Sequence, residues 1–268
     1  MKTPLTFLLS LTFLFLFSGS VYGEEPEVKK KYWKNGKLKS ETHFKNGKKN
    51  RLETSFFENG IKFSEVHFKN GKLEGLKTIF YESGKKRYEI YYKNNEKDGL
   101  QKSWYTSGGK ENETYYKNGK PEGLHKSYYE SGEKHFEIYY KSGKREGLAN
   151  FWYKTGQKKN EVPYKNGEKE GLGTSWYKSG KKKNEVSYKN GIREGLGTSW
   201  YESGEKNSEV YYKNGEREGV RKSWYKSSKK QSLKYFKNGV ENGIRKEWDE
   251  NGNLTFEGNY VDGVEEIK

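Results

Sequence analysis

The stretch from Tyr164 to Ser187, YKNGEKEGLGTSWYKSGKKKNEVS, decides the fold because the next 24 residues nearly repeat it. Residues 188–211 read YKNGIREGLGTSWYESGEKNSEVY, and 17 of the 24 aligned positions are identical. The same spacing extends over residues 28–267, which hold ten units of 24 residues. A period of this length indicates a repeat architecture in which every unit is one small structural motif.

Each unit contains two short segments in which apolar and polar residues alternate, a period typical of β-strands. Asn-Gly and Ser-Gly steps join the segments, and glycine or asparagine supplies the positive φ that tight hairpin turns need. Three glycines recur in nearly every unit, represented here by Gly167, Gly171 and Gly180, and we expect them to be structural. The sequence therefore predicts an all-β fold, an elongated single-sheet solenoid or meander of tandem 24-residue β-hairpins.

Three columns of residues at the repeat spacing are predicted to hold the hairpins together. The first is aromatic and includes Trp104, Trp152, Trp176, Trp200 and Trp224. The second contains Tyr164 and Tyr188, and the third contains Leu172 and Leu196. We expect all three columns on one side of the sheet, where each ring buried by a stacked neighbour gains roughly 1.5–3 kcal/mol.

A few positions break the pattern. Arg51 stands where later units have glycine, and Ser228 replaces a turn glycine in the ninth unit, where we expect a bulge or kink. Pro163 lies inside a presumed central strand and cannot donate a ladder hydrogen bond, so we expect imperfect pairing or a bulge there.

The first residues differ from the repeats. Lys2 precedes an apolar run over residues 5–17, which predicts a secretory signal peptide over residues 1–23 and one repeat domain over residues 24–268. The alternative is an uncleaved N-terminal anchor. We expect an exported protein that is periplasmic, cell-surface or secreted. The chain has no cysteine, which excludes disulfides and a cysteine nucleophile.

The pattern Y-K-N-G-x-x-E-G-L-x-x-S-W-Y-x-S-G over residues 164–180 resembles a MORN repeat in its bacterial variant form. The resemblance covers nearly all of residues 28–268. It implies stacked β-hairpins in an elongated, twisted sheet that acts as a scaffold or binding module, in some members for membrane lipids. Bacterial proteins of this variant are often labelled YwqK-type antitoxins of toxin–antitoxin pairs. An antitoxin that acts in the cytoplasm would not need the signal peptide expected here.

The search for chemistry favours a non-enzymatic protein without a cofactor, metal or small-molecule substrate. His43 and His67 occupy one column, but no third metal ligand accompanies them. A column of glutamates, such as Glu161 and Glu185, recurs in nearly every unit and therefore defines no unique acid–base site. We expect each glutamate to be offset by a nearby lysine such as Lys158 or Lys182.

Two rows of residues are candidate binding surfaces. The candidate binding face is a row of tyrosines expected to be exposed: Tyr81, Tyr105, Tyr129, Tyr153, Tyr177, Tyr201 and Tyr225. The candidate basic ridge is a row of lysines that precede one turn: Lys93, Lys117, Lys141, Lys165, Lys189 and Lys213. Alternatively, the tyrosines only cover the sheet and the lysines keep it soluble.

With a formal net charge of +16, the chain suits an anionic partner. The favoured hypothesis is a scaffold that binds a protein partner through an extended aromatic and basic face, with affinity summed over many repeats. One alternative is a module for anionic lipid or cell-wall polysaccharide, and another is an antitoxin-like or immunity partner of a toxin. Nucleic acid is not expected for an exported chain.

Overall fold

The computed structural model describes residues 27–266, which form one antiparallel β-sheet of 23 strands. None of these residues belongs to a helix that could serve as a membrane span. The predicted signal peptide lies outside the described residues. The strands are β1 (Glu27–Tyr32), β2 (Leu38–Lys45), β3 (Lys48–Phe56), β4 (Lys62–Lys69), β5 (Lys72–Phe80), β6 (Lys86–Lys93), β7 (Glu96–Trp104), β8 (Lys110–Lys117), β9 (Lys120–Tyr128), β10 (Lys134–Lys141), β11 (Lys144–Arg145), β12 (Gly147–Trp152), β13 (Lys158–Lys165), β14 (Glu168–Lys169), β15 (Gly171–Trp176), β16 (Lys182–Lys189), β17 (Ile192–Trp200), β18 (Lys206–Lys213), β19 (Glu216–Trp224), β20 (Lys230–Lys237), β21 (Val240–Trp248), β22 (Leu254–Val261) and β23 (Val264–Glu265).

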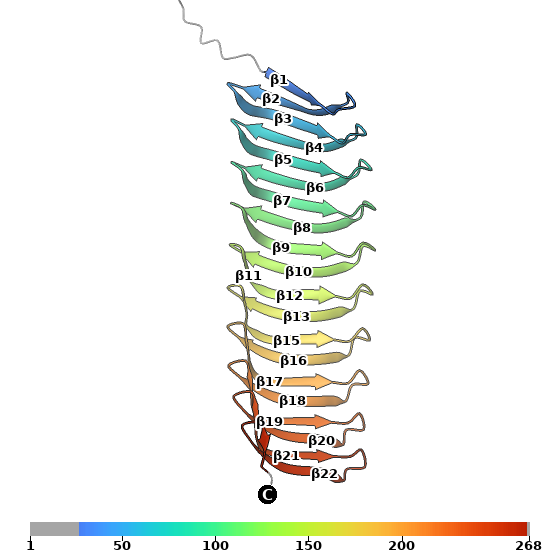
Figure 1. Ribbon diagram of the computed structural model, residues 1–268, viewed down its shortest axis with the longest axis vertical. Helices are drawn as coiled ribbons and strands as arrows, with labels where there is room; N and C mark the ends of the chain where they lie inside the picture. Colours follow the sequence, from blue (N-terminus) through green and yellow to red (C-terminus); the bar gives the residue numbers. More distant parts are fainter. Residues whose placement is uncertain (1–26, 267–268) are drawn as a thin grey trace, which may run out of the picture.

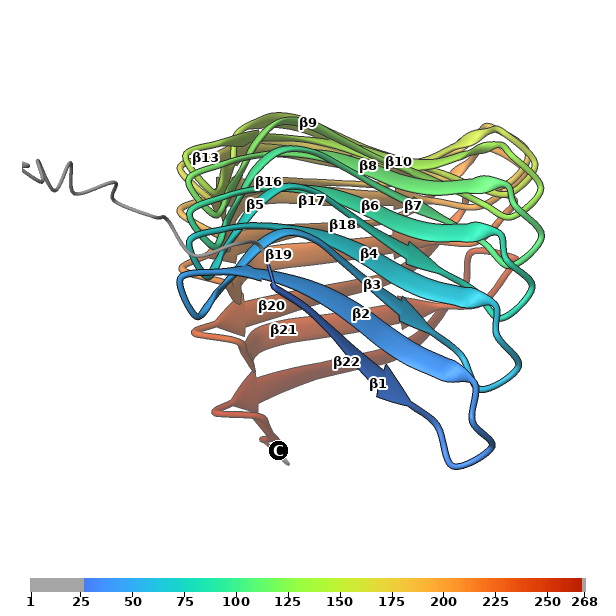
Figure 2. The ribbon, with the colours of Figure 1, turned by 90° about the horizontal axis from the view of Figure 1, so that it is seen from above.

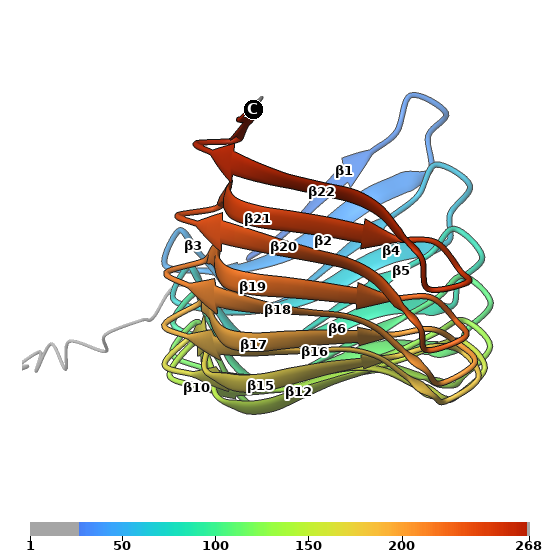
Figure 3. The same cartoon turned by 90° about the horizontal axis from the view of Figure 1, so that it is seen from below.

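The hairpins stack in sequence order along one axis (Figure 1), which confirms the predicted meander of tandem hairpins. Each long strand pairs with the next long strand, while the short pieces β11 and β14 precede β12 and β15 and pair with β10 and β13. Seen along the stack, the middle hairpins lie to one side of both ends, so the sheet is bowed (Figures 2 and 3). The sheet is open and leaves β1 at its N-terminal edge.

Two different turns alternate along the chain. The Asn-Gly turn has two residues, with Asn190 at φ 50° and Gly191 at φ 81°, as a type I′ hairpin requires. At the other end of the hairpin, the Gly180 amide donates to the Tyr177 carbonyl (3.0 Å) and the Tyr177 amide donates to the Lys181 carbonyl (2.9 Å). This second turn is a three-residue loop closed by a glycine at positive φ.

A register shift of one residue follows the second turn. Trp176 pairs with Lys182, but the adjacent Ser175 pairs with Asn184, so Lys183 is an extra residue in β16. The equivalent shift is present in the hairpins from β1–β2 to β21–β22. Without this shift Leu172 would lie opposite Val186, whereas in the structure Leu172 lies opposite Ser187. One bulged residue therefore exchanges the faces of the second strand.

The shift overturns the expectation that all three columns share one side of the sheet. The face that carries Leu172, Thr174, Trp176, Glu185 and Ser187 is called the leucine face. The opposite face carries Gly173, Ser175, Asn184, Val186 and Tyr188 and is called the valine face. Tyr188 lies so close over Gly173 that a Cβ there would be 3.0 Å from the ring. The column of Tyr164 and Tyr188 thus lies on the valine face, whereas the leucine and tryptophan columns lie on the leucine face.

The core is a thin row on the valine face. Ala149 is only 1% exposed, and the most buried aliphatic side chains are otherwise Val66, Ile90, Ile138 and Val210, all at the Val186 position of their repeats. By contrast, Leu172 and Leu196 are each 50% exposed. The tryptophans of the first column are half-buried. In a single sheet, a side chain is buried only by the side chains of neighbouring strands on the same face. The leucines are covered only in part, so their burial contributes little stabilising free energy.

The irregular positions are accommodated without new distortions. The ninth unit shows the same register shifts as its neighbours, so the bulge or kink expected there is not special to it. Ser228 takes the glycine conformation at φ 65°. Pro163 lies where the register between β13 and the following strand changes, so no regular ladder bond is required of it. The alternative of a bulge at Pro163 is confirmed.

Arg51 adopts φ 69° at a bulge where the other repeats have glycine, a conformation that costs a non-glycine residue roughly 1–2 kcal/mol. We expect Arg51→Gly to stabilise the N-terminal hairpins by about 0.5–1 kcal/mol, because glycine's own entropic cost offsets part of the relief. Urea unfolding followed by circular dichroism measures the change. The control Asn50→Gly, at the neighbouring strand position, should destabilise instead. Equal effects of the two substitutions would contradict this explanation.

Candidate functional site

The tyrosines of the candidate binding face connect successive repeats. Each hydroxyl donates to the main-chain carbonyl of the residue 23 positions later, as Tyr177 does to Trp200 at 2.8 Å. The bonded pairs are Tyr81–Trp104, Tyr105–Tyr128, Tyr129–Trp152, Tyr153–Trp176, Tyr177–Trp200, Tyr201–Trp224 and Tyr225–Trp248. Burial raises the pKa of the Tyr81 and Tyr105 phenols, which keeps them protonated as donors. These contacts tie each three-residue turn to the next hairpin.

These rings are half-buried rather than exposed, so the expectation of an exposed tyrosine row is wrong. At the start of the stack the same position is Trp33, whose indole nitrogen donates to the Phe56 carbonyl at 3.3 Å. In the next repeat it is Phe57, which has no donor and packs edge-on against Phe63 at 5.0 Å. The row therefore offers a partner less surface than an exposed row of tyrosines would.

A second set of contacts at the opposite end of the hairpins was not anticipated from the sequence. In the E-G-L step, the Glu170 carboxylate accepts a hydrogen bond from the main-chain N–H of Asn190 in the next Asn-Gly turn at 2.8 Å. Equivalent acidic residues accept from the turns of the following repeats: Glu74, Asp98, Glu122, Glu146, Glu194 and Glu218. In the sequence, an acidic residue precedes this glycine at the 24-residue spacing, and that recurrence could have indicated a shared contact.

The tyrosine contact predicts a measurable loss of stability. Tyr177→Phe removes the donor to the Trp200 carbonyl, and we expect the free energy of unfolding to fall by about 1 kcal/mol. Tyr211→Phe is the matched control, because Tyr211 is 46% exposed and its hydroxyl has no bond within residues 27–266. Urea denaturation of both variants tests the difference. If both cost the same, the contact is not stabilising.

The leucine face carries the exposed apolar surface. Leu196 lies opposite Tyr211, and their exposed fractions are 50% and 46%. We call the whole row the leucine–tyrosine stripe; its cross-strand pairs are Leu76–Tyr91, Leu100–Tyr115, Leu124–Tyr139, Leu196–Tyr211 and Val220–Tyr235. Leu148 and Leu172 continue the stripe opposite Pro163 and Ser187.

The candidate basic ridge borders this stripe. Lys213 follows Tyr211 by two residues in β18, so alternation places it on the leucine face beside that ring. All six ridge lysines are exposed. Successive members are separated by two strands, about 10 Å. The sequence thus indicated the lysine ridge, but it did not show which tyrosine row lies beside it.

Farther from the ridge, lysines on the leucine face are engaged with the protein itself. Lys182 pairs with Glu185 at 2.6 Å, and its ammonium lies 5.8 Å from the Trp200 ring centroid in the next repeat. Lys158 makes the same contacts with Glu161 and Trp176. The predicted offset of the glutamate column by these lysines is confirmed. Such exposed pairs contribute about 1 kcal/mol or less each.

On the valine face, cations alternate with aromatic rings along the stack. Lys169 lies over Tyr188, Arg193 over Tyr212 and Arg217 over Phe236, with cation-to-centroid distances of 4.8, 5.3 and 5.3 Å. We call this the cation–tyrosine row. Nearer the N-terminus Lys97 lies 4.7 Å over Tyr116, and burial lowers the pKa of Lys97. The row presents positive charge on the face opposite the ridge.

The repeat pattern and its hairpin geometry match one known family along almost the whole chain. Ten segments correspond to the MORN repeat variant: residues 28–46, 52–70, 73–94, 97–120, 121–142, 145–166, 169–190, 193–214, 217–238 and 241–262. The chain belongs to the MORN repeat variant family. A search of curated proteins found no match. MORN repeats are a non-catalytic repeat type.

The MORN repeats described here assemble no group of three or more potential metal ligands within residues 27–266. His43 and His67 each use Nδ1 on a main-chain carbonyl of the adjacent strand, that of Leu52 (2.7 Å) and that of Leu76 (2.8 Å). These two histidines thus bind their neighbouring strands.

His125 and His135 make stability depend on pH. Burial lowers the pKa of both, and Lys159 lowers that of His135 further. Because their folded pKa lies below the unfolded value of about 6.5, stability is full above that pH and falls as the unfolded chain binds extra protons below it. We expect thermal denaturation to occur at lower temperature at about pH 5.5 than at about pH 7.5.

His125→Gln should reduce this pH dependence, since Gln101 occupies the same position one repeat earlier. His43→Gln, at a histidine outside this pair, is the control and should leave the dependence largely intact. An unchanged slope in His125→Gln would assign the effect to other groups.

Proposed function

We propose that this protein is an exported, non-catalytic scaffold that binds a protein partner along its leucine face. The observation that carries the proposal is the leucine–tyrosine stripe, whose tyrosines are 37–46% exposed over many repeats. A large exposed apolar patch on a soluble protein commonly marks a site of interaction. The apolar run over residues 5–17 supports export.

The composition of the leucine face favours protein over other ligands. Tyrosine with aliphatic neighbours, surrounded by charged residues, is the usual arrangement of a protein interface with an apolar centre and a polar rim. Because the same pair recurs about every 10 Å, a partner can gain affinity from several equivalent contacts. No single repeat needs to bind tightly.

Charge complementarity defines the partner further. The ridge lysines border the stripe and are exposed, and the chain carries a formal net charge of +16. An acidic protein surface with protruding apolar side chains would match both features, with the charges steering association and the stripe supplying affinity. An antitoxin-like role would be one case of such binding.

The ridge by itself favours a second candidate, an anionic envelope surface of lipid or polysaccharide. Each lysine near an anionic membrane contributes about 1 kcal/mol, and this attraction is lost at high salt. Apolar contacts along the stripe would persist at high salt. The two candidates therefore differ in salt response and in the residues they need.

The experiment compares three baits: the wild-type chain, a stripe variant and a ridge variant. The stripe variant carries Tyr91→Ser, Tyr115→Ser and Tyr139→Ser. Serine is the natural residue at this repeat position in Ser187. The ridge variant carries Lys93→Gln, Lys117→Gln and Lys141→Gln on the same three repeats. Each is incubated with envelope extract and with vesicles containing anionic lipid.

We expect the wild-type chain to capture an acidic protein that, once purified, binds it directly. Binding should persist at about 0.5 M NaCl. The stripe variant should not bind this protein. The ridge variant should slow its association more than it speeds dissociation. Retention of this protein by the stripe variant, or binding only to vesicles and only through the ridge, would refute the proposal. Circular dichroism establishes that all three baits are folded.

A further inference from the structure

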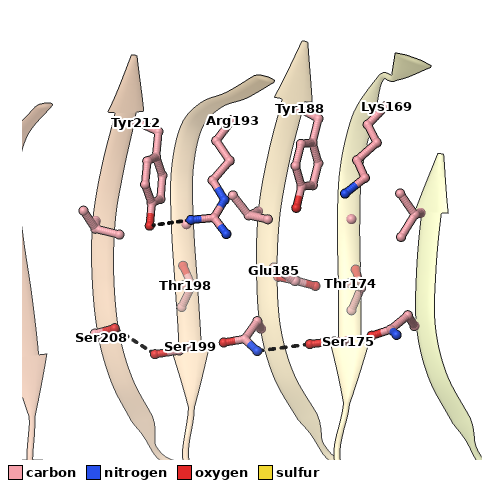
Figure 4. Close-up of a pocket in the computed structure, with 17 residues that line it drawn as sticks. Lys169, Thr174, Ser175, Glu185, Tyr188, Arg193, Thr198, Ser199, Ser208 and Tyr212 are labelled. Carbon is pink, nitrogen blue, oxygen red and sulfur yellow. Dashed lines mark hydrogen bonds between the residues drawn. The ribbon is translucent and has the colours of Figure 1, made fainter. Parts of the chain in front are cut away.

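The valine face is hollowed over the middle of the C-terminal half of the stack. A cavity of about 550 Å³ lies across β13 to β18, and Figure 4 shows the side chains that line it. Its floor is formed at Gly173 and Gly197, both buried. The Tyr188 and Tyr212 rings and the Lys169 and Arg193 side chains lie at one end.

The glycine floor of this hollow is specific to these two repeats. At the position of Gly173 and Gly197, other repeats place a side chain: Lys77, Gln101, His125, Ala149, Arg221 and Arg245. Two consecutive glycines leave the space open. The glycines are not required by the backbone there, since neither has a positive φ.

The cations at the hollow are available to an anion. Arg193 donates from Nη1 to the Tyr212 hydroxyl at 3.4 Å and lies 5.3 Å from that ring's centroid. Lys169 lies 4.8 Å from the Tyr188 centroid. Within residues 27–266, neither Lys169 nor Arg193 forms an ion pair with a carboxylate. Glu185 is also among the residues at the cavity, but it belongs to the leucine face and pairs there with Lys182 at 2.6 Å.

Hydroxyl and amide groups line the other end of the hollow. The Asn184 amide donates to Ser175 Oγ at 3.2 Å, and the hydroxyls of Ser199 and Ser208 are 2.8 Å apart (Figure 4). A hydroxyl has one donor and two acceptor lone pairs, so these groups keep bonding capacity for a ligand. The site thus combines paired cations, tyrosine rings and a row of neutral polar groups.

We propose that this hollow binds an acidic oligosaccharide. Carboxylates of the sugar would contact Lys169 and Arg193, ring hydroxyls would bond the serine and asparagine groups, and the tyrosines would pack against apolar sugar faces. A neutral sugar would leave the two cations unmatched, and a simple polyanion would leave the neutral polar groups unused.

The spacing of the cation–tyrosine row indicates how far apart the carboxylates of the ligand should be. Arg145 and Arg217 extend the row on either side of the hollow, with successive cations two strands apart, about 10 Å. A β-linked pyranose advances along an extended chain by about one strand spacing. The row therefore fits a polysaccharide that has one carboxylate in every disaccharide and runs along the stack.

This site lies on the face opposite the leucine–tyrosine stripe, so it is independent of the proposed protein binding. The probe is a hyaluronan octasaccharide, in which uronic acid alternates with a neutral sugar. Chitohexaose serves as a neutral probe and inorganic polyphosphate as a polyanion without sugar rings. Binding to the full repeat domain is measured by calorimetry.

We expect hyaluronan to bind and chitohexaose to bind at least about tenfold more weakly. Lys169→Gln with Arg193→Gln should weaken hyaluronan binding at least about tenfold, because two charge-assisted hydrogen bonds are lost. The control, Lys154→Gln with Lys178→Gln, removes the same charge from two exposed turns that lie outside both the hollow and the ridge. It should change affinity by no more than about twofold.

A second variant tests the space without changing charge. Gly173→Gln with Gly197→Gln fills the hollow with the residue found at Gln101, and we expect it to abolish binding. The proposal is overturned if hyaluronan does not bind, or if both charge variants weaken it equally, which would indicate net charge alone. Polyphosphate binding that depends on Lys169 and Arg193 as strongly as hyaluronan binding does would also overturn it.

Discussion

The one-residue bulge after each Ser-Gly turn is the constraint on which the rest of the structure depends. The three-residue turn closes with glycine at positive φ, and Lys183 then enters β16 as an unpaired residue. Every side chain beyond it points to the face opposite the one a regular ladder would give. Because the bulge recurs in each hairpin, the same exchange is repeated along the stack and produces two uniform faces.

From the repeat of Glu74 and Tyr81 to that of Glu218 and Tyr225, both ends of the hairpin are bonded to the next hairpin. At one end the Tyr177 hydroxyl donates a hydrogen bond to the Trp200 carbonyl. At the other end the Glu170 carboxylate accepts one from the main-chain N–H of Asn190. Between them the β-ladder and a thin row of buried aliphatic residues are shared only by neighbours. Stability is therefore a sum of similar nearest-neighbour terms, which explains how a chain with 30% hydrophobic residues forms a large ordered body without an enclosed core.

The two faces have different chemistry although one repeat generates both. The leucine face presents aliphatic and tyrosine side chains beside exposed lysines, the surface that we propose binds an acidic protein. On the valine face the tyrosines cover the core and support a row of cations, and one hollow has a floor of Gly173 and Gly197, where other repeats carry larger residues. Uniform repeats thus supply a platform, and a local departure from the repeat supplies a distinct site.

The sequence by itself determined the hairpin, the 24-residue period, the positions of the glycine turns and the lysine–glutamate pairing, because each depends on local spacing and turn chemistry. It did not determine which columns share a face, since a single bulged residue inverts that relation and leaves no compositional signal. The row from Tyr81 to Tyr225 was therefore assigned to a free surface, whereas its hydroxyls bond the next repeat. Only the tertiary structure decided which rings are covered, because coverage depends on the register between strands.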